Sequence, residues 1–107
     1  LVLLGIFFSP PAGSAAYFAG GASASNNGHD DGTIGIGKES KASHGAVAIG
    51  QKAKAEARHN VAIGYGADSG TDANSITIGY NTKATGPATV TVGSGSEARD
   101  RSVVLGA

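Results

Sequence analysis

One four-residue pattern recurs six times in this chain of 107 residues and constrains its fold more than any other feature. Each copy consists of an apolar residue, a small or neutral residue, a second apolar residue and a glycine, as in Val47-Ala48-Ile49-Gly50. The closing glycines follow one another at steps of 13, 14, 15, 14 and 13 residues, and they are Gly37, Gly50, Gly64, Gly79, Gly93 and Gly106. Self-similarity at a fixed short period predicts a solenoid, in which each repeat forms one coil.

The apolar positions of the pattern lie two residues apart, which is the period of a β-strand with one buried face. Val, Ile and Thr suit such a strand because their branched side chains pack well on a pleated surface. We expect the apolar residues of all six copies to face inward and form the core: Ile34, Ile36, Val47, Ile49, Val61, Ile63, Ile76, Ile78, Val90, Val92, Val103 and Leu105. The glycine that ends each strand can take a positive φ, so it predicts a tight turn.

Small side chains recur three and five residues after the turn glycines. They are Ser40, Ala42, Ala53, Ala55, Ala67, Ser69, Thr82, Ala84, Ser96 and Ala98. This second alternation predicts a return strand whose inward positions must be small. The fold class predicted from the pattern is therefore all-β, a parallel roll in which about 14 residues form two short strands and two turns.

The composition divides the chain into three parts. Residues 1–20 are apolar, residues 21–32 are polar and glycine-rich and predict a loop, and residues 33–107 carry the clear repeats. We interpret residues 1–20 as an N-terminal cap or packing strand, because Val2–Gly5 and Tyr17–Gly20 imitate the repeat. A remnant of a secretory leader is the alternative, since an apolar run followed by small residues resembles the end of one. The run is too short to span a bilayer as a helix.

Charge and cysteine content exclude several classes of protein. The formal net charge is zero, which removes the electrostatic argument for a nucleic acid or an anionic membrane as partner. Cysteine is absent, so neither disulfides nor thiolate metal sites are available. The segment Gly93–Ala98 fits a dinucleotide-binding fingerprint, but another repeat follows it where that fingerprint requires a helix. We predict no cofactor.

No arrangement of residues indicates an enzyme. His29, His44 and His59 are 15 residues apart but stand at different distances from the next strand, which favours solvated turn histidines over an ion or proton site on a symmetry axis. Acyltransferases built on left-handed β-helices have six-residue repeats, unlike the present period. No Ser, His and Asp combination or carboxylate pair stands out, so we predict a non-enzymatic protein.

Two columns of residues are expected on the surface of the roll. Four residues after the glycines stand Lys41, Lys54, Asp68, Lys83 and Glu97, which predict an exposed ionic ladder that fixes the register. One residue after consecutive glycines stand Tyr65 and Tyr80, which should stack on adjacent coils. Exposed tyrosine is a common binding anchor, so this pair is the candidate ligand surface, and stacking between coils explains it equally well.

The repeated ladder resembles the head domain of the trimeric autotransporter adhesins, with YadA-like head repeats. Val47–Gly50, Asn60–Gly64 and Asn74–Gly79 carry the resemblance, which covers residues 33–107. It implies a left-handed parallel β-roll that assembles as a homotrimer, with the apolar strand residues facing the core and the threefold axis. It also implies an extracellular adhesin on a bacterial cell surface that binds collagen or other matrix proteins. The neck, coiled coil and membrane anchor of that family have no counterpart in the sequence.

A roll this slim is marginal alone and needs neighbours, most simply copies of itself. The apolar N-terminal run and the last repeat, which ends at Gly106, suggest a second way to satisfy this need. Rolls stacked end to end would make the chain a structural subunit of a secreted fibre, which is the alternative function.

Overall fold

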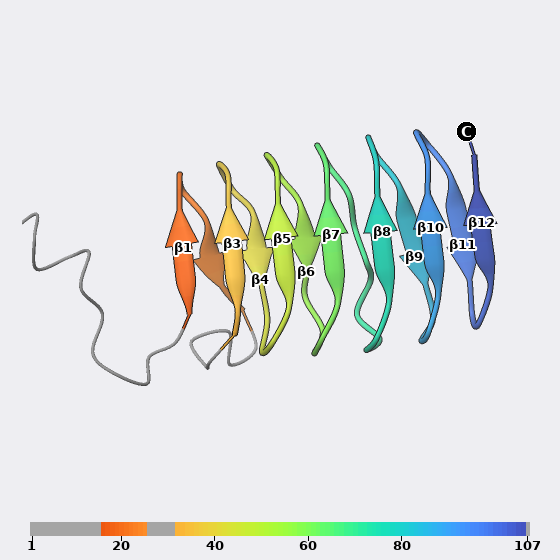
Figure 1. Cartoon of the computed structure of the whole chain (residues 1–107), viewed down its shortest axis with the longest axis horizontal. Helices are drawn as coiled ribbons and strands as arrows, with labels where there is room; N and C mark the ends of the chain where they lie inside the picture. The colour runs from red at the N-terminus through yellow and green to blue at the C-terminus, as the bar shows by residue number, and fades with distance from the viewer. Residues whose placement is uncertain (1–15, 26–31, 107) are drawn as a thin grey trace, which may run out of the picture.

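The computed structural model describes residues 16–25 and 32–106, which wind into a solenoid of short parallel strands (Figure 1). One strand from each coil joins a seven-stranded parallel sheet in the order β1 (Tyr17–Ala19), β3 (Ile34–Ile36), β5 (Val47–Ile49), β7 (Val61–Ile63), β8 (Ile76–Ile78), β10 (Val90–Val92) and β12 (Val103–Leu105). Among the described residues, no helix is long and apolar enough to cross a membrane.

The return strands lie behind this sheet and form two smaller parallel sheets (Figure 1). One contains β2 (Ser23–Ala24), β4 (Lys41–Ala42) and β6 (Lys54–Ala55), and the other contains β9 (Lys83–Thr85) and β11 (Glu97–Arg99). Asp68 makes isolated bridges to Lys54 and Lys83, so it joins the two sheets across the coil between them. The predicted roll of two strands and two turns per repeat is confirmed.

Successive copies of the pattern pair in register. Val47 lies opposite Val61, Ala48 opposite Ala62 and Ile49 opposite Ile63, and the same positions pair along the rest of the sheet. Equivalent side chains therefore form columns along the solenoid, spaced by the strand separation of about 4.8 Å.

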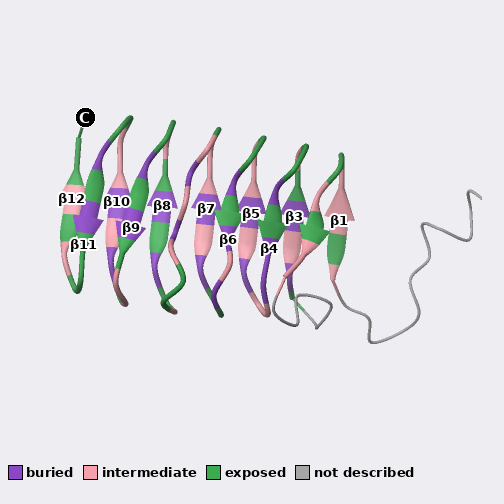
Figure 2. Ribbon diagram, turned by 180° about the vertical axis from the view of Figure 1, so that it is seen from behind, coloured by how far each residue is buried: buried purple, intermediate pink, exposed green. Residues whose placement is uncertain are grey.

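The interior is formed by the middle residue of each strand and not by its apolar flanks. Ala48, Ala62, Thr77 and Thr91 are fully buried, and Figure 2 shows buried bands in the middle of β5, β7, β8 and β10. The prediction that the flanking residues fill the inside of the roll is wrong. They lie on the outer face, half-buried or exposed: Ile34, Ile36, Val47, Ile49, Val61, Ile63, Ile76, Ile78, Val90, Val92, Val103 and Leu105.

Geometry explains this correction. In a strand of three residues the first and third side chains share one face, and the second points to the other. From β3 onward the side chains buried between the two sheets of each coil are small, those of Ala, Ser and Thr together with Asn60. The predicted inward positions of the return strands are confirmed, because all of them are buried: Ser40, Ala42, Ala53, Ala55, Ala67, Ser69, Thr82, Ala84, Ser96 and Ala98.

The solenoid begins before the predicted start at residue 33. Strands β1 and β2 form an additional coil, so the prediction of a polar loop is wrong for Ser23 and Ala24. Phe18 packs against the core from the middle of β1, and Gly35 beside it leaves the space, since a Cβ there would lie 2.7 Å from the phenyl ring. The imitation of the repeat at Val2–Gly5, like the rest of residues 1–15, lies outside the described residues.

The turn glycines are required for two reasons. All six have φ between 117° and 133°, as predicted for Gly37, Gly50, Gly64, Gly79, Gly93 and Gly106. They also stack directly on one another, so that a Cβ on Gly64 would lie 2.6 Å from the carbonyl oxygen of Gly79. Close contact lets the turn of each coil hydrogen-bond to the next, as Gly64 N donates to Ile49 O at 2.8 Å.

Replacement of Gly64 by alanine tests this double requirement. We expect Gly64→Ala to destabilise the fold by about 3 kcal/mol or more, because strained backbone and collision with Gly79 add together. Gly95 also has a positive φ of 70°, but nothing lies within 4 Å of its Cβ position, so Gly95→Ala should cost only about 1 kcal/mol. Chemical unfolding followed by circular dichroism measures both. Equal losses would contradict the role of close stacking.

Candidate functional site

The two candidate binding tyrosines lie side by side on the surface. Tyr65 and Tyr80 each follow a turn glycine, and their side chains are exposed by 42% and 57%. Their ring centroids are 5.6 Å apart, and the ring planes are inclined by 23°. The predicted stacking on adjacent coils is therefore confirmed, while the binding role remains a prediction.

An open groove of about 770 Å³ runs beside this pair. We call it the tyrosine–lysine groove, and its lining residues are Glu39, Lys41, Lys52, Lys54, Tyr65, Gly66, Asp68, Tyr80 and Asn81. These residues come from the turns that follow the glycines and from the return strands, and none comes from the seven-stranded sheet. The groove therefore shares no residue with the apolar outer face of the seven-stranded sheet.

Gly66 is the one glycine among the residues that line the groove. It stands two residues after a turn glycine, where three other coils place Glu39, Lys52 and Asn81 with φ between 52° and 64° and the coil after Gly93 places Gly95 with φ of 70°. Gly66 has a similar φ of 69°, so the turn itself accepts other residues at this position. A Cβ on Gly66 would collide with the side-chain oxygen of Asn81, so the amide of Asn81 lies directly above Gly66. Sequence reasoning missed this residue.

The charged column follows the predicted order. Backbone pairing places Lys41, Lys54, Asp68, Lys83 and Glu97 on consecutive coils. Within the part of the chain that the structure describes, no two of these side chains form an ion pair within 4.0 Å, so the backbone sets the register without an ionic ladder. This agrees with the small net free energy of exposed pairs. The lysine side chains remain available to a ligand, while Asp68 Oδ1 already accepts a hydrogen bond from Gly70 N at 2.9 Å.

Two histidines approach each other despite their different distances from the next strand. The rings of His44 and His59 have centroids 5.8 Å apart and an interplanar angle of 54°. Within residues 16–25 and 32–106, no group of three His, Cys, Asp or Glu side chains is placed to hold a metal ion. His29 lies outside the described residues.

The resemblance of Gly93–Ala98 to a dinucleotide fingerprint has no structural counterpart. The segment leads directly into β11, a parallel neighbour of β9, and the pattern requires a helix there. The glycine at position 93 is explained by the turn column, where it stacks on Gly106.

Asn60 is a buried residue whose role sequence reasoning missed. It is fully buried and is the largest such side chain among the described residues. Its amide nitrogen donates to the carbonyl oxygens of Ser69 at 3.2 Å and Asp72 at 3.0 Å, and its oxygen accepts from the backbone N–H of Ser75 at 2.8 Å. One side chain thus supports the loop of the 15-residue coil between Gly64 and Gly79. The 15-residue step between Gly64 and Gly79 was the available signal.

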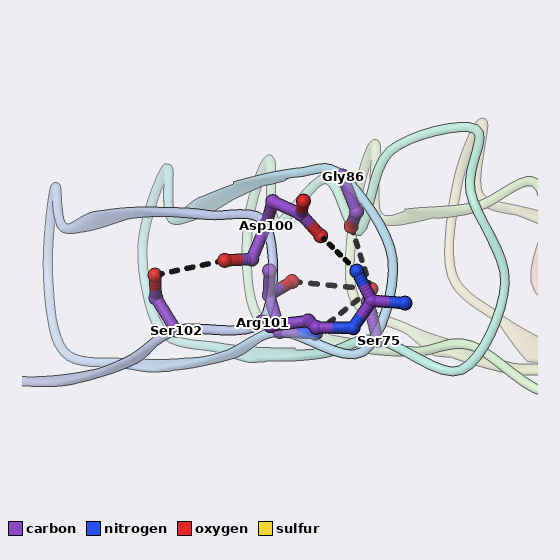
Figure 3. Close-up of polar contacts among 6 residues, drawn as sticks. Ser75, Gly86, Asp100, Arg101 and Ser102 are labelled. Carbon is purple, nitrogen blue, oxygen red and sulfur yellow. Dashed lines mark hydrogen bonds and ion pairs between the residues drawn. The ribbon is translucent and has the colours of Figure 1, made fainter.

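Hydroxyl groups continue this polar interior toward the C-terminal coils (Figure 3). The hydroxyl of Thr89 donates to Ser75 Oγ at 3.1 Å, and Ser75 Oγ donates to the carbonyl oxygen of Gly86 at 3.2 Å. On the exposed side, Ser102 Oγ donates to the Asp100 carbonyl, while Arg101 pairs with the Asp100 carboxylate at 3.4 Å. Buried Ser and Thr hydroxyls therefore form hydrogen bonds with main-chain groups of the turns inside the roll.

Comparison of the chain with protein-family models, with curated proteins and with solved structures gives no match. The function proposed below therefore depends on the sequence pattern and the geometry described above.

Replacement of Asn60 tests its role in the 15-residue coil. We expect Asn60→Ala to reduce the free energy of unfolding by about 2–3 kcal/mol, because three carbonyls and one N–H lose their buried partner. Thr89→Ala is the matched control, since Thr89 is equally buried just before its strand but donates one side-chain hydrogen bond. It should cost about 1 kcal/mol. Limited proteolysis should cut residues 69–75 faster in Asn60→Ala only, and resistance equal to wild type would contradict this account.

Proposed function

We propose that the chain is the head of an extracellular bacterial adhesin, a left-handed parallel β-roll that assembles as a homotrimer and binds collagen or another matrix protein. It acts without catalysis or a cofactor. The observation that carries this proposal is the apolar outer face of the seven-stranded sheet. The resemblance of the repeats to adhesin heads supplies the threefold symmetry and the surface location.

The apolar face consists of two columns in register. Ile34, Val47, Val61, Ile76 and the equivalent residues beyond them form the first column, and Ile36 begins the second. Ile36, Ile76 and Ile78 are still exposed by 37–38% in the single chain. No described strand of this sheet contains a charged residue. A continuous apolar patch without charges is typical of the centre of a protein–protein interface.

The path of the chain supports the left-handed sense. In Figure 1 the chain rises along the near sheet and descends behind it while it advances from left to right. Packing of three rolls through their apolar faces would leave the tyrosine–lysine groove open, since the groove includes no residue of the seven-stranded sheet. The groove is then the surface that a matrix protein contacts.

Molar mass in solution tests the assembly. We expect wild-type protein to have the mass of three chains by light scattering, and Ile63→Glu to abolish the trimer because it places a charge in the apolar face. Thr85→Glu introduces the same side chain on the exposed return strand β9 and should stay trimeric. A monodisperse folded monomer, or a trimeric Ile63→Glu, would refute the trimer. A mass that grows with concentration would favour end-to-end fibres instead.

Ligand binding tests the tyrosines. We expect the double variant Tyr65→Ala/Tyr80→Ala to bind immobilised type I collagen and fibronectin about tenfold or more weakly, since exposed aromatic anchors dominate many interfaces. Its trimer and circular dichroism should not change. Gln51→Ala/Ser94→Ala removes side chains at the same position of neighbouring coils and should bind normally. Wild-type binding by the tyrosine variant would eliminate this surface.

A further inference from the structure

Most main-chain N–H groups of the tyrosine–lysine groove are already paired. Gly66 N donates to Gln51 O at 3.0 Å, Asn81 N donates to Tyr65 O at 2.8 Å, and Asp68 N donates to Thr82 O at 2.9 Å. The N–H of Lys52 is paired in the same way with Lys38 O at 2.9 Å. An extended peptide that adds to a sheet edge needs free main-chain groups. A ligand of this groove is therefore recognised mainly by side chains.

The side chains of the groove combine four kinds of chemistry. Tyr65 and Tyr80 offer aromatic rings, and Asn81 offers an amide that both donates and accepts. Glu39 and Asp68 accept hydrogen bonds from hydroxyl groups. The lysines of the groove, at positions 41, 52 and 54, carry positive charge toward a carboxylate or sulfate. A sugar chain with acidic groups presents all the complementary features: C–H faces, many hydroxyls and anions.

We infer that the tyrosine–lysine groove binds an acidic oligosaccharide, a chain of pyranose rings that carries carboxylate or sulfate groups. This inference rests on the proposed function, because it takes the groove as the ligand surface of the adhesin. Single-stranded nucleic acid also uses aromatic and basic side chains. The carboxylates of Glu39 and Asp68 oppose a phosphate on every residue of such a chain, and they suit the hydroxyls of a sugar.

The order of the groove residues along the solenoid sets the orientation and length of the ligand. Lys41, Lys52 and Lys54 belong to the coils that follow Gly37 and Gly50, and the tyrosines follow Gly64 and Gly79. Four coils span about 14 Å at a separation of about 4.8 Å. An oligosaccharide of a few rings therefore places an anion over the lysines and a ring against Tyr65. Gly66 follows Tyr65 and carries no side chain, and the amide oxygen of Asn81 lies above it, where it can accept a hydrogen bond from a sugar hydroxyl.

Calorimetric titration of the wild-type protein tests the inference with defined probes. These are a hyaluronan hexasaccharide, which carries only carboxylates, a heparin hexasaccharide, which adds sulfates, and neutral chitohexaose. We expect binding of at least one acidic probe, weaker binding at raised salt, and no binding of chitohexaose. Tyr65→Ala/Tyr80→Ala and Lys52→Ala/Lys54→Ala should each weaken binding about tenfold or more.

Matched variants separate this site from general charge attraction. Lys38→Ala/Lys83→Ala removes the same charge outside the groove and should bind like wild type. Equal losses in the two lysine pairs, no binding of either acidic probe, or tighter binding of oligothymidylate would overturn the inference. Collagen and fibronectin are measured in parallel. Binding of a matrix protein without an acidic sugar refutes only this inference, whereas the reverse result refutes matrix-protein recognition as the proposed function.

Discussion

The main-chain hydrogen bonds between successive coils are the interaction on which the rest of the structure depends. They run along the seven-stranded sheet and through both turns of each coil. For example, Val61 N donates to Ser75 O at 2.9 Å, and Gly79 N donates to Ile63 O at 2.8 Å. The interior between the sheets is one layer of Ala, Ser and Thr, which buries little apolar area per residue. These main-chain hydrogen bonds therefore fix the separation of the coils, and equivalent side chains on successive coils have the same spacing.

The thin interior has a consequence for the apolar residues. A roll that admits only small side chains leaves its Val, Ile and Leu residues on the outside of the sheet, where water contacts them. In the described part of the chain these side chains stay half-buried or exposed, and the proposed association with other copies would bury them further. Folding and assembly of such a protein are then expected to be coupled, since the isolated coil lacks the burial that offsets its conformational entropy.

The sequence contains the period, the strands, the turn glycines and the stacked tyrosines, because each depends on residues at fixed spacing within a coil. The sequence did not reveal which face of the strand points inside. A period of two shows which residues share a face, but it does not show whether that face points into the roll or away from it. The small residues at Ala48, Ala53 and Ala55 would have decided this, because a bulky column cannot face them at close range. Gly66 and Asn60 were missed because their roles depend on neighbours in other coils. The strand at Tyr17–Ala19 was anticipated because Tyr17–Gly20 imitates the repeat, but the return strand of this coil was missed because Ser23 and Ala24 lack the flanking pattern.

A regular backbone also explains how a site arises here. The turn after each glycine repeats with little change, so the groove results from substitutions within columns: tyrosine in place of Gln51, glycine in place of Lys52, and aspartate in place of Lys54 one coil further on. None of these changes needs a new main-chain conformation, as the shared positive φ at Lys52 and Gly66 illustrates. The 15-residue coil follows the same principle, since its extra residue is accommodated by the side-chain hydrogen bonds of Asn60. A regular backbone can therefore carry a specific surface, because the main-chain hydrogen bonds hold the coils together while the exposed side chains differ from coil to coil.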